Sequence, residues 1–349
     1  MRTALSQTAR ALVAHERGIL VLDEGMRTCN RRFREVGVPE TAEARRAYRE
    51  WIVATPGLAN SLNATILGEE TVHQSTRDGI GFCAALSRAG IIPGIAADLG
   101  AAELPLQAAE QVATGLDGLH RRLFLHAHLG ARFAAWRSFF LIGDGLPSPG
   151  CVAMNAYALA RFAAASQADG LVPVLGAEVL TDGDHPLDVC AVVTEQVLRA
   201  LLHQLGVQGV ELGALVLTVT MVLPGERCAR RESTEQVASA TVQCLRNTVP
   251  EAVTGIAFLS GNQGSLLAST RLNAIAQRYR QRVPWPMTFA FSQALLHHAF
   301  DLWRGRVEAV PAAQEALAHR ARCNQLACRG SYAIDEERAH GWRAAGALS

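Results

Sequence analysis

Polar residues of the kinds that carry catalysis stand at the ends of apolar runs in this 349-residue sequence. Asp23 closes the run GILVLD, Arg137 interrupts FAAWRSFFLIG, and Glu178 lies near the end of LVPVLGAEVL. A buried carboxyl group with a raised pKa can move a proton, or it can serve as the partner of an arginine. Both interpretations stay open for Asp23 and Glu178. Arg137 needs one of them, or a bound anion, because an unpaired charge inside a strand is costly.

Other apolar runs also end in small polar residues that could bind a ligand. These residues are Asp98 in GIAAD, Thr218 and Thr220 in LTVT, Ser260 and Gly261 in FLSG, and Ser292 and Gln293 in FSQ. The stretch SGNQG at 260–264 could present backbone N–H groups to an anion in a loop before a helix, or it could be only a turn. We therefore expect a small-molecule ligand where these run ends meet.

The elements that must position these residues alternate along the chain. Eight short apolar runs are separated by longer segments with helical periodicity, which is typical of repeated βα units around a parallel sheet. The runs cover 18–23, 62–67, 91–100, 133–143, 171–180, 214–222, 252–261 and 286–292. This pattern predicts an α/β protein with a single (β/α)8 TIM barrel over residues 1–332 and a C-terminal tail over 333–349. An open doubly wound sheet is the alternative, although no GxGxxG follows the first run.

In a barrel of this kind the functional residues lie at the carboxyl ends of the strands, where the polar residues named above are found. The segment TDGDHPLD suggests a turn before a helix, so we assign His185 a structural place there, with Asp182 or Asp184 as the helix cap. His297 and His298 are adjacent and would point in different directions on a helix. The sequence therefore predicts no metal site and no cofactor.

The composition excludes several classes of function. All 33 basic residues are arginines, since no lysine occurs, and they balance 32 acids to a net charge of +1. The arginines near the amino terminus are interleaved with acids, so we expect no nucleic-acid partner. No apolar stretch is long enough to span a membrane as a helix, and eight scattered cysteines without CxxC indicate reduced thiols. The expected location is cytoplasmic.

Several stretches identify a family. RGILVLDEG, GLDGLHRR, LVPVLGAEVLTDGDHPLD, TMVLPG, RNTVPEAVTGIAFLSGNQG and LACRGSY closely resemble class I fructose-1,6-bisphosphate aldolases, along nearly the whole chain. The resemblance implies a TIM barrel and a homo-oligomer, generally a tetramer. It also implies cleavage or formation of a carbon–carbon bond between a triose phosphate and an aldehyde, through a Schiff base on a lysine.

The family's functional positions divide into two groups in this chain. The Schiff-base lysine matches Thr218, two further lysines match Ala96 and Ala135, a glutamate matches Gly176, and a phosphate-binding arginine matches Gln293. The family residues kept are Asp23, Arg137, Glu178, Ser260 and Gly261, with Arg32 in the basic pair near a second phosphate site.

A hydroxyl group cannot form an iminium ion with a ketone, so the resemblance together with Thr218 predicts that ordinary class I aldolase activity is absent. The favoured hypothesis is a repurposed barrel enzyme that acts on a carbonyl or small organic acid substrate in a widened, less cationic pocket. Its candidate catalytic residues are Asp23, Arg137 and Glu178. The alternatives are a non-catalytic binding or regulatory protein, and a fructose-bisphosphate aldolase.

Overall fold

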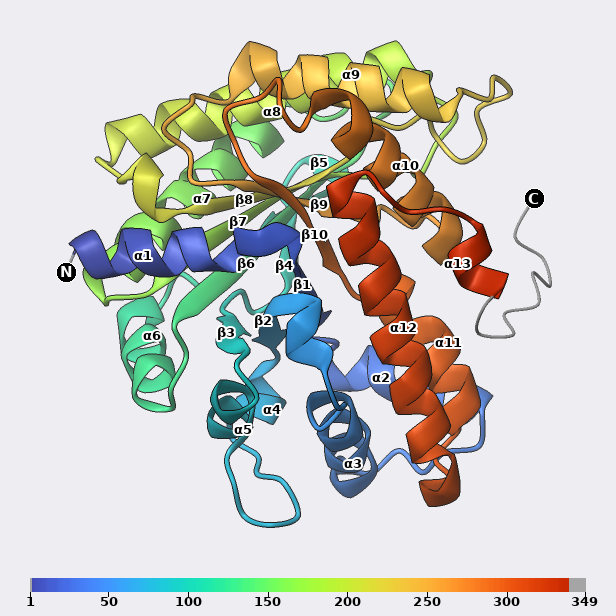
Figure 1. The fold of residues 1–349 in the computed structure, drawn as a ribbon. Helices are drawn as coiled ribbons and strands as arrows, with labels where there is room; N and C mark the ends of the chain where they lie inside the picture. The colour runs from blue at the N-terminus through green and yellow to red at the C-terminus, as the bar shows by residue number, and fades with distance from the viewer. Residues whose placement is uncertain (1, 339–349) are drawn as a thin grey trace.

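The computed structural model describes residues 2–338, and it contains a closed barrel of eight parallel strands (Figure 1). The barrel strands are β1 (Gly18–Leu22), β2 (Leu62–Leu67), β3 (Ile92–Ala96), β6 (Phe133–Phe140), β7 (Val172–Val179), β8 (Val216–Thr220), β9 (Ile256–Leu259) and β10 (Met287–Phe291). Each pairs with its neighbours in chain order, and β1 closes the ring against β10. All eight predicted runs are confirmed as strands, and so is the predicted TIM barrel.

Helices follow the strands, and most of them cover the outside of the barrel (Figure 1). They are α1 (Arg2–Leu12), α2 (Met26–Glu35), α3 (Ala42–Val53), α4 (Glu69–Val72), α5 (Phe82–Arg88), α6 (Leu119–His128), α7 (Pro149–Ala168), α8 (Leu187–Val207), α9 (Thr234–Thr248), α10 (Ser265–Tyr279), α11 (Gln293–Trp303), α12 (Val310–Arg329) and α13 (Asp335–Arg338). No helix among residues 2–338 is both long and apolar enough to cross a lipid bilayer.

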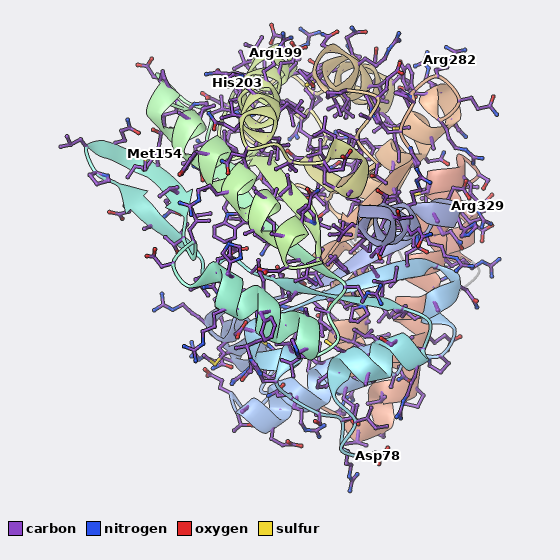
Figure 2. All side chains as sticks on the ribbon, turned by 90° about the vertical axis from the view of Figure 1, so that its left-hand side faces the viewer. Asp78, Met154, Arg199, His203, Arg282 and Arg329 are labelled. Carbon is purple, nitrogen blue, oxygen red and sulfur yellow. The ribbon has the colours of Figure 1, made fainter. Side chains whose placement is uncertain are left out.

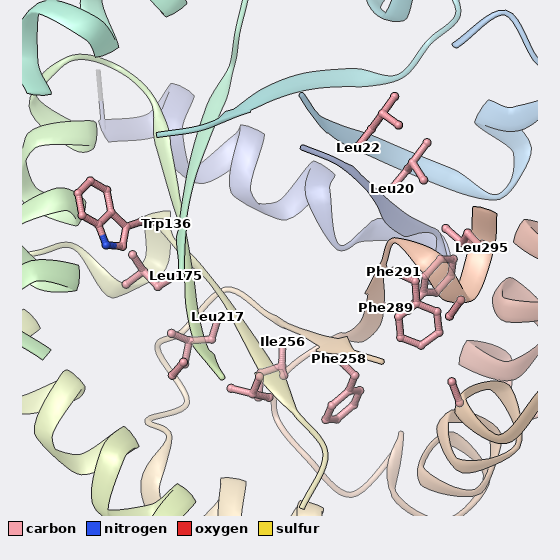
Figure 3. Close-up of a cluster of buried hydrophobic side chains, with 14 of the residues drawn as sticks. Leu20, Leu22, Trp136, Leu175, Leu217, Ile256, Phe258, Phe289, Phe291 and Leu295 are labelled. Carbon is pink, nitrogen blue, oxygen red and sulfur yellow. The ribbon is translucent and has the colours of Figure 1, made fainter. Parts of the chain in front are cut away.

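Alternation along the strands divides the core into two layers, because successive strand side chains point to opposite faces. Leu20, Leu22 and Leu217 belong to the larger cluster, which fills the space between barrel and helices (Figure 3). Their neighbours Ile19 and Val21 belong to a second cluster. That cluster also contains buried residues of α1, so the first helix packs on the interior layer of the barrel.

Small residues make the interior layer possible. An added Cβ at Gly94 would lie 2.2 Å from the ring of Phe133, so the glycine on β3 admits the aromatic side chain of β6. Ala96 and Ala135, which the resemblance predicts to stand at positions of family lysines, pair with each other across the same two strands and pack in or against the interior cluster. These alanines therefore contribute to barrel packing.

Helix starts follow local sequence signals in some places and not in others. Ser233 and Gln236 form a reciprocal capping box at the start of α9. The predicted cap of α8 by Asp182 or Asp184 is wrong: Pro186 is the N-cap residue, and no side chain caps this helix. Proline before the first turn moves the start of the helix beyond the reach of either aspartate. His185 lies buried in the turn that precedes it.

An antiparallel hairpin was not predicted. Strands β4 (Ala101–Leu104) and β5 (Gln107–Ala113) follow β3 and form a separate two-stranded sheet. The hairpin extends from the barrel beside the helix that carries Met154 (Figure 2). Its alanines and glutamates do not alternate in polarity, so no strand pattern marks it in the sequence.

The end of the described chain differs from a simple tail. Helix α13 covers Asp335–Arg338, and Glu337 on it is buried against Arg320 of α12. The domain boundary at residue 332 stays a prediction. Most of the expected tail, residues 339–349, lies outside the described residues.

Candidate functional site

A cavity of about 440 Å3 opens at the carboxyl ends of strands β6 to β10. Seven of the predicted site residues line it: Arg137, Glu178, Thr220, Ser260, Gly261, Ser292 and Gln293. The loop between β9 and α10 and the start of α10 line the cavity continuously over residues 260–265. The site therefore occupies the end of the barrel where function was expected.

The position of the Arg137 side chain depends on a glycine in the next strand. Strand register places Arg137 beside Gly176, and Gly176 beside Thr218. An added Cβ at Gly176 would lie 2.7 Å from Cγ of Arg137 and 3.1 Å from Oγ1 of Thr218. The arginine thus uses space that a larger residue on β7 would fill.

Gly176→Ala should lower the free energy of unfolding by about 1–3 kcal/mol, because the new methyl group overpacks against the arginine stem. The matched control is Gly206→Ala on α8, where nothing lies within 4 Å of the added Cβ. That change should stabilise the protein by up to about 1 kcal/mol, since alanine favours helix over glycine. Urea denaturation measures both. Equal effects of the two substitutions would contradict the packing described for Gly176.

An ion pair links three strands at the cavity. Nη2 of Arg137 lies 2.7 Å from Oδ2 of Asp23, and its Nε lies 4.0 Å from Oε1 of Glu178. The predicted partnership of Arg137 with an acid is confirmed. Asp23 is almost fully buried at the end of β1, whereas about a third of the arginine side chain is exposed towards the cavity. Asp23 consequently orients the guanidinium group, and the arginine side chain lines the cavity.

The carboxyl group of Glu178 has a pKa close to neutral pH. Burial raises the pKa of its carboxyl group from 4.5 to about 7; Arg137 opposes this shift, and the carboxylates of Asp23 and Asp98 add to it. Its Oε1 is buried and accepts no hydrogen bond. Burial also raises the pKa of Asp98, whose Oδ1 accepts a hydrogen bond from the Gly100 N–H at 3.3 Å. A carboxyl group that titrates near neutrality can donate and accept a proton at one position.

The raised pKa of Glu178 predicts a pH dependence of stability. The folded state holds this proton between pH 4.5 and about 7 while the unfolded state has lost it, so stability falls as pH rises through that window. Glu178→Gln removes the titration. One pKa unit corresponds to about 1.4 kcal/mol. The stability of the variant minus that of the wild type should therefore rise by up to about 3 kcal/mol between pH 4.5 and pH 8. Urea denaturation at the two pH values checks this, and a difference that does not change with pH would contradict it.

The loop between β9 and α10 forms one end of the cavity. Gly261 and Asn262 both have positive φ angles, 56° and 60°, so the backbone turns sharply between β9 and α10. No side chain caps the first turns of α10 or α11, and residues at both helix starts line the cavity. Uncapped N–H groups at helix starts attract anions. This end of the cavity can hold a phosphate group.

The residues predicted for the site do not all reach the cavity. Thr218 is buried beside Gly176, Asp98 lies behind Arg137, and none of Ala96, Ala135, Gly176 or Thr218 is part of the cavity wall. Arg32 donates a hydrogen bond to Glu24 at 2.9 Å and lies over the ring of Phe300, away from the cavity. The expected contribution of Arg32, Asp98 and Thr218 to ligand binding stays a prediction.

Three residues that were not assigned to the site belong to its surroundings. Thr181 and His297 line the cavity, and Gln263 does so while accepting a hydrogen bond from Arg271 at 2.8 Å. Arg271 is half-buried on α10, and burial lowers the pKa of its guanidinium group. The motif SGNQG could have identified Gln263, but nothing in the sequence places Arg271 behind that loop.

A barrel with a buried carboxyl group of near-neutral pKa, a partly exposed arginine and uncapped helix starts around a cavity at its carboxyl end has the features of a barrel enzyme's active site. The family model for fructose-bisphosphate aldolase class-I matches residues 4–345. The chain belongs to this family.

Individual relatives agree with this membership. The chain is 43% identical over 329 residues to a probable fructose-bisphosphate aldolase class 1 of Xanthomonas campestris pv. campestris, covering 94% of this chain and 98% of that protein. It is 39% identical to fructose-bisphosphate aldolase 3, chloroplastic, of Arabidopsis thaliana, covering 95% and 84%. A solved fructose-bisphosphate aldolase from Plasmodium falciparum, in complex with TRAP and a small-molecule inhibitor, superposes with a TM-score of 0.93 at 38% identity, covering 95% of each chain.

These findings correct the functional hypothesis drawn from the sequence. The prediction of a repurposed barrel enzyme for a carbonyl or small organic acid substrate is wrong, as is its non-catalytic alternative, because relatives about 40% identical over nearly the full length are named fructose-bisphosphate aldolases. The expectation that aldolase activity is absent is overturned by the same findings. The hypothesis gave the interpretation of position 218 more weight than the resemblance along nearly the whole chain, and that resemblance is what the family match bears out.

Proposed function

We propose that the protein is a fructose-bisphosphate aldolase, a carbon–carbon lyase that cleaves fructose 1,6-bisphosphate into two triose phosphates. The observation that carries the proposal is the cavity at the barrel mouth, where Glu178 and Arg137 face the loop at 260–264. The names of its relatives support the same substrate. One phosphate would bind the N–H groups of this loop and of the starts of α10 and α11.

The proposal includes a route without a lysine imine. No lysine occurs in the chain, and Thr218 is proposed to stand where the family has its Schiff-base residue. In the proposed route the Glu178 carboxylate takes the hydroxyl proton at carbon 4, and the bond between carbons 3 and 4 breaks. The electron pair moves to the carbonyl oxygen at carbon 2, where Arg137 stabilises the enolate. Glu178 then returns the proton to carbon 3, which completes the second triose phosphate.

Triose-phosphate release from fructose 1,6-bisphosphate tests the function. We expect slow but enzyme-dependent cleavage that borohydride does not inactivate, because no side-chain amine forms a reducible imine. Glu178→Gln should lower the rate by at least about 100-fold, as expected for a lost general acid–base group. Glu195→Gln, on the outer face of α8, is the matched control and should leave the rate unchanged. A wild-type rate equal to the rate without protein would overturn the proposal.

A homo-oligomer in the cytoplasm is also part of the proposal. Its support is the family resemblance, which implies a tetramer. Relatives named as chloroplastic and as cytosolic both exist, so the family alone does not determine location. Sedimentation of the purified protein tests the oligomeric state, and a concentration-independent monomer would contradict it.

A further inference from the structure

A second cluster of reactive side chains lies where α13 meets α12, and none of its residues lines the cavity. Helix α12 carries His319 and Cys323 one turn apart, so that both point to the same side. Helix α13 contributes Glu337 to the same place, and Figure 1 shows this short helix at the end of the loop that follows α12. All three side chains are at least nine-tenths buried.

The distances within this cluster suit a metal ion. Nε2 of His319 lies 3.5 Å from Sγ of Cys323 and 3.7 Å from Oε2 of Glu337, and all three atoms lie within 4.8 Å of one another. Zinc bond lengths of about 2.0 Å to nitrogen or oxygen and about 2.3 Å to sulfur place tetrahedral ligands roughly 3.3–3.6 Å apart. The two measured distances are already close to this range, and the third pair, Sγ of Cys323 and Oε2 of Glu337, needs to approach by at most about 1.5 Å for all three atoms to share one ion.

The carboxyl group of Glu337 is already oriented for such a role. Its Oε1 accepts a hydrogen bond from the Tyr332 hydroxyl at 2.7 Å and pairs with Nη2 of Arg320 at 2.6 Å. Its Oε2 is buried, accepts no hydrogen bond, and lies on the side of His319 and Cys323. One oxygen is thus fixed by outer partners and the other is left for an ion, as is common for ligands of metal centres.

We propose that His319, Cys323 and Glu337 bind a divalent transition-metal ion of the zinc type, with a water molecule as the fourth ligand. Histidine, thiolate and carboxylate are the ligand types that zinc prefers. The Cys323 thiol must release its proton to solvent when the ion binds, because the thiolate is the form that coordinates metal. The thiolate and the carboxylate supply two negative charges to the ion, and the paired Arg320 guanidinium group leaves the centre with a net charge of +1.

The site would join α13 to α12. Helix α13 has only four residues, too few for stability by itself, so its attachment depends on the contacts of Tyr332 and Glu337. A shared ion would add coordination bonds between the two helices, where Nε2 of His319 and Oε2 of Glu337 now lie 3.7 Å apart. The site does not involve the cavity residues and is independent of the proposed function.

Another group with suitable residue types carries no such proposal. Glu69, His73 and His126 also lie close together. Their ligand atoms are joined by hydrogen bonds, from His73 at 3.1 Å and from His126 at 2.9 Å, to the two oxygens of Glu69. Glu69 and His73 are also half-exposed. The ligand atoms of this group are therefore already used in hydrogen bonds to one another.

Cobalt titration of the full-length protein tests the proposed site. Co2+ binds zinc sites and gives a thiolate-to-cobalt charge-transfer band in the near ultraviolet only when sulfur is a ligand. We expect one equivalent of Co2+ to produce this band and one equivalent of Zn2+ to abolish it. Cys323→Ser should eliminate the band, and Tyr332→Phe should weaken Co2+ binding about 10- to 100-fold, because it removes an outer partner of Glu337.

Cys244→Ser is the matched control, since Cys244 is an equally buried thiol on α9 that belongs to no group of three close ligand atoms among the described residues. This variant should keep the band at full strength. The wild-type titration does not depend on any variant folding. Failure of the wild-type protein to show a saturable band at one equivalent would overturn the proposal, as would an unchanged band in folded Cys323→Ser.

Discussion

Arg137→Met should abolish measurable cleavage of fructose 1,6-bisphosphate. Arg137 is the only arginine among the described residues that line the cavity. In the proposed route its guanidinium group stabilises the enolate oxygen. Loss of one such donor typically lowers a rate by about 100- to 1000-fold. Because the rate without an imine is already expected to be slow, this reduction brings it to background.

The same substitution should lower stability by about 2 kcal/mol. Removing one partner of a fully buried ion pair costs about 3–5 kcal/mol, and the exposure of Arg137 reduces that effect. Asp23 then stays buried without its cation. Arg199→Met is the matched control, because Arg199 forms an exposed pair with Glu195 on α8 and should cost less than about 0.5 kcal/mol. Triose-phosphate release and urea denaturation measure the two effects, and a fully active Arg137→Met protein would refute the assigned role.

Thr218→Lys should create an imine-forming site that the wild-type protein lacks. Thr218 is buried beside Gly176, and the Arg137 side chain passes over that glycine. Burial and the neighbouring guanidinium both lower the pKa of an amine placed there, which favours its neutral, nucleophilic form. With dihydroxyacetone phosphate and borohydride, the variant should gain the mass of one reduced adduct per chain.

A surface lysine provides the comparison. Gln243→Lys on the exposed face of α9 introduces an amine with an ordinary pKa, which is protonated at neutral pH and should give little adduct. The wild-type protein should give none from its side chains. Intact-mass measurement distinguishes the three proteins. Equal labelling of both variants, or no labelling of folded Thr218→Lys, would contradict the assignment of position 218.

Much of the fold could be predicted because its signals are local. Eight apolar runs and the helical periodicity between them indicate a barrel. Each of these runs contains one strand of the barrel. The hairpin at β4 and β5 was missed, since alanine and glutamate mix without a period of two. The caps proposed at Asp182 and Asp184 were wrong because Pro186 occupies the start of α8.

The site was predictable in part. Residues at the ends of strands converge in any barrel of this kind, so Arg137, Glu178 and Ser260 could be placed together before their contacts were known. The contacts of Arg32 could not be predicted in the same way. Its side chain lies against Glu24 and Phe300, because α2 packs against α11.

Composition and motifs by themselves determined the barrel, the aldolase family and the absence of any side-chain amine, because each depends only on which residues occur and in what order. Tertiary structure decided which groups interact. It brought Asp23 to Arg137, raised the pKa of Glu178 by burial, and joined His319 and Cys323 to Glu337. These properties arise from distance and solvent exclusion, which vary steeply with the packing of residues far apart in the chain.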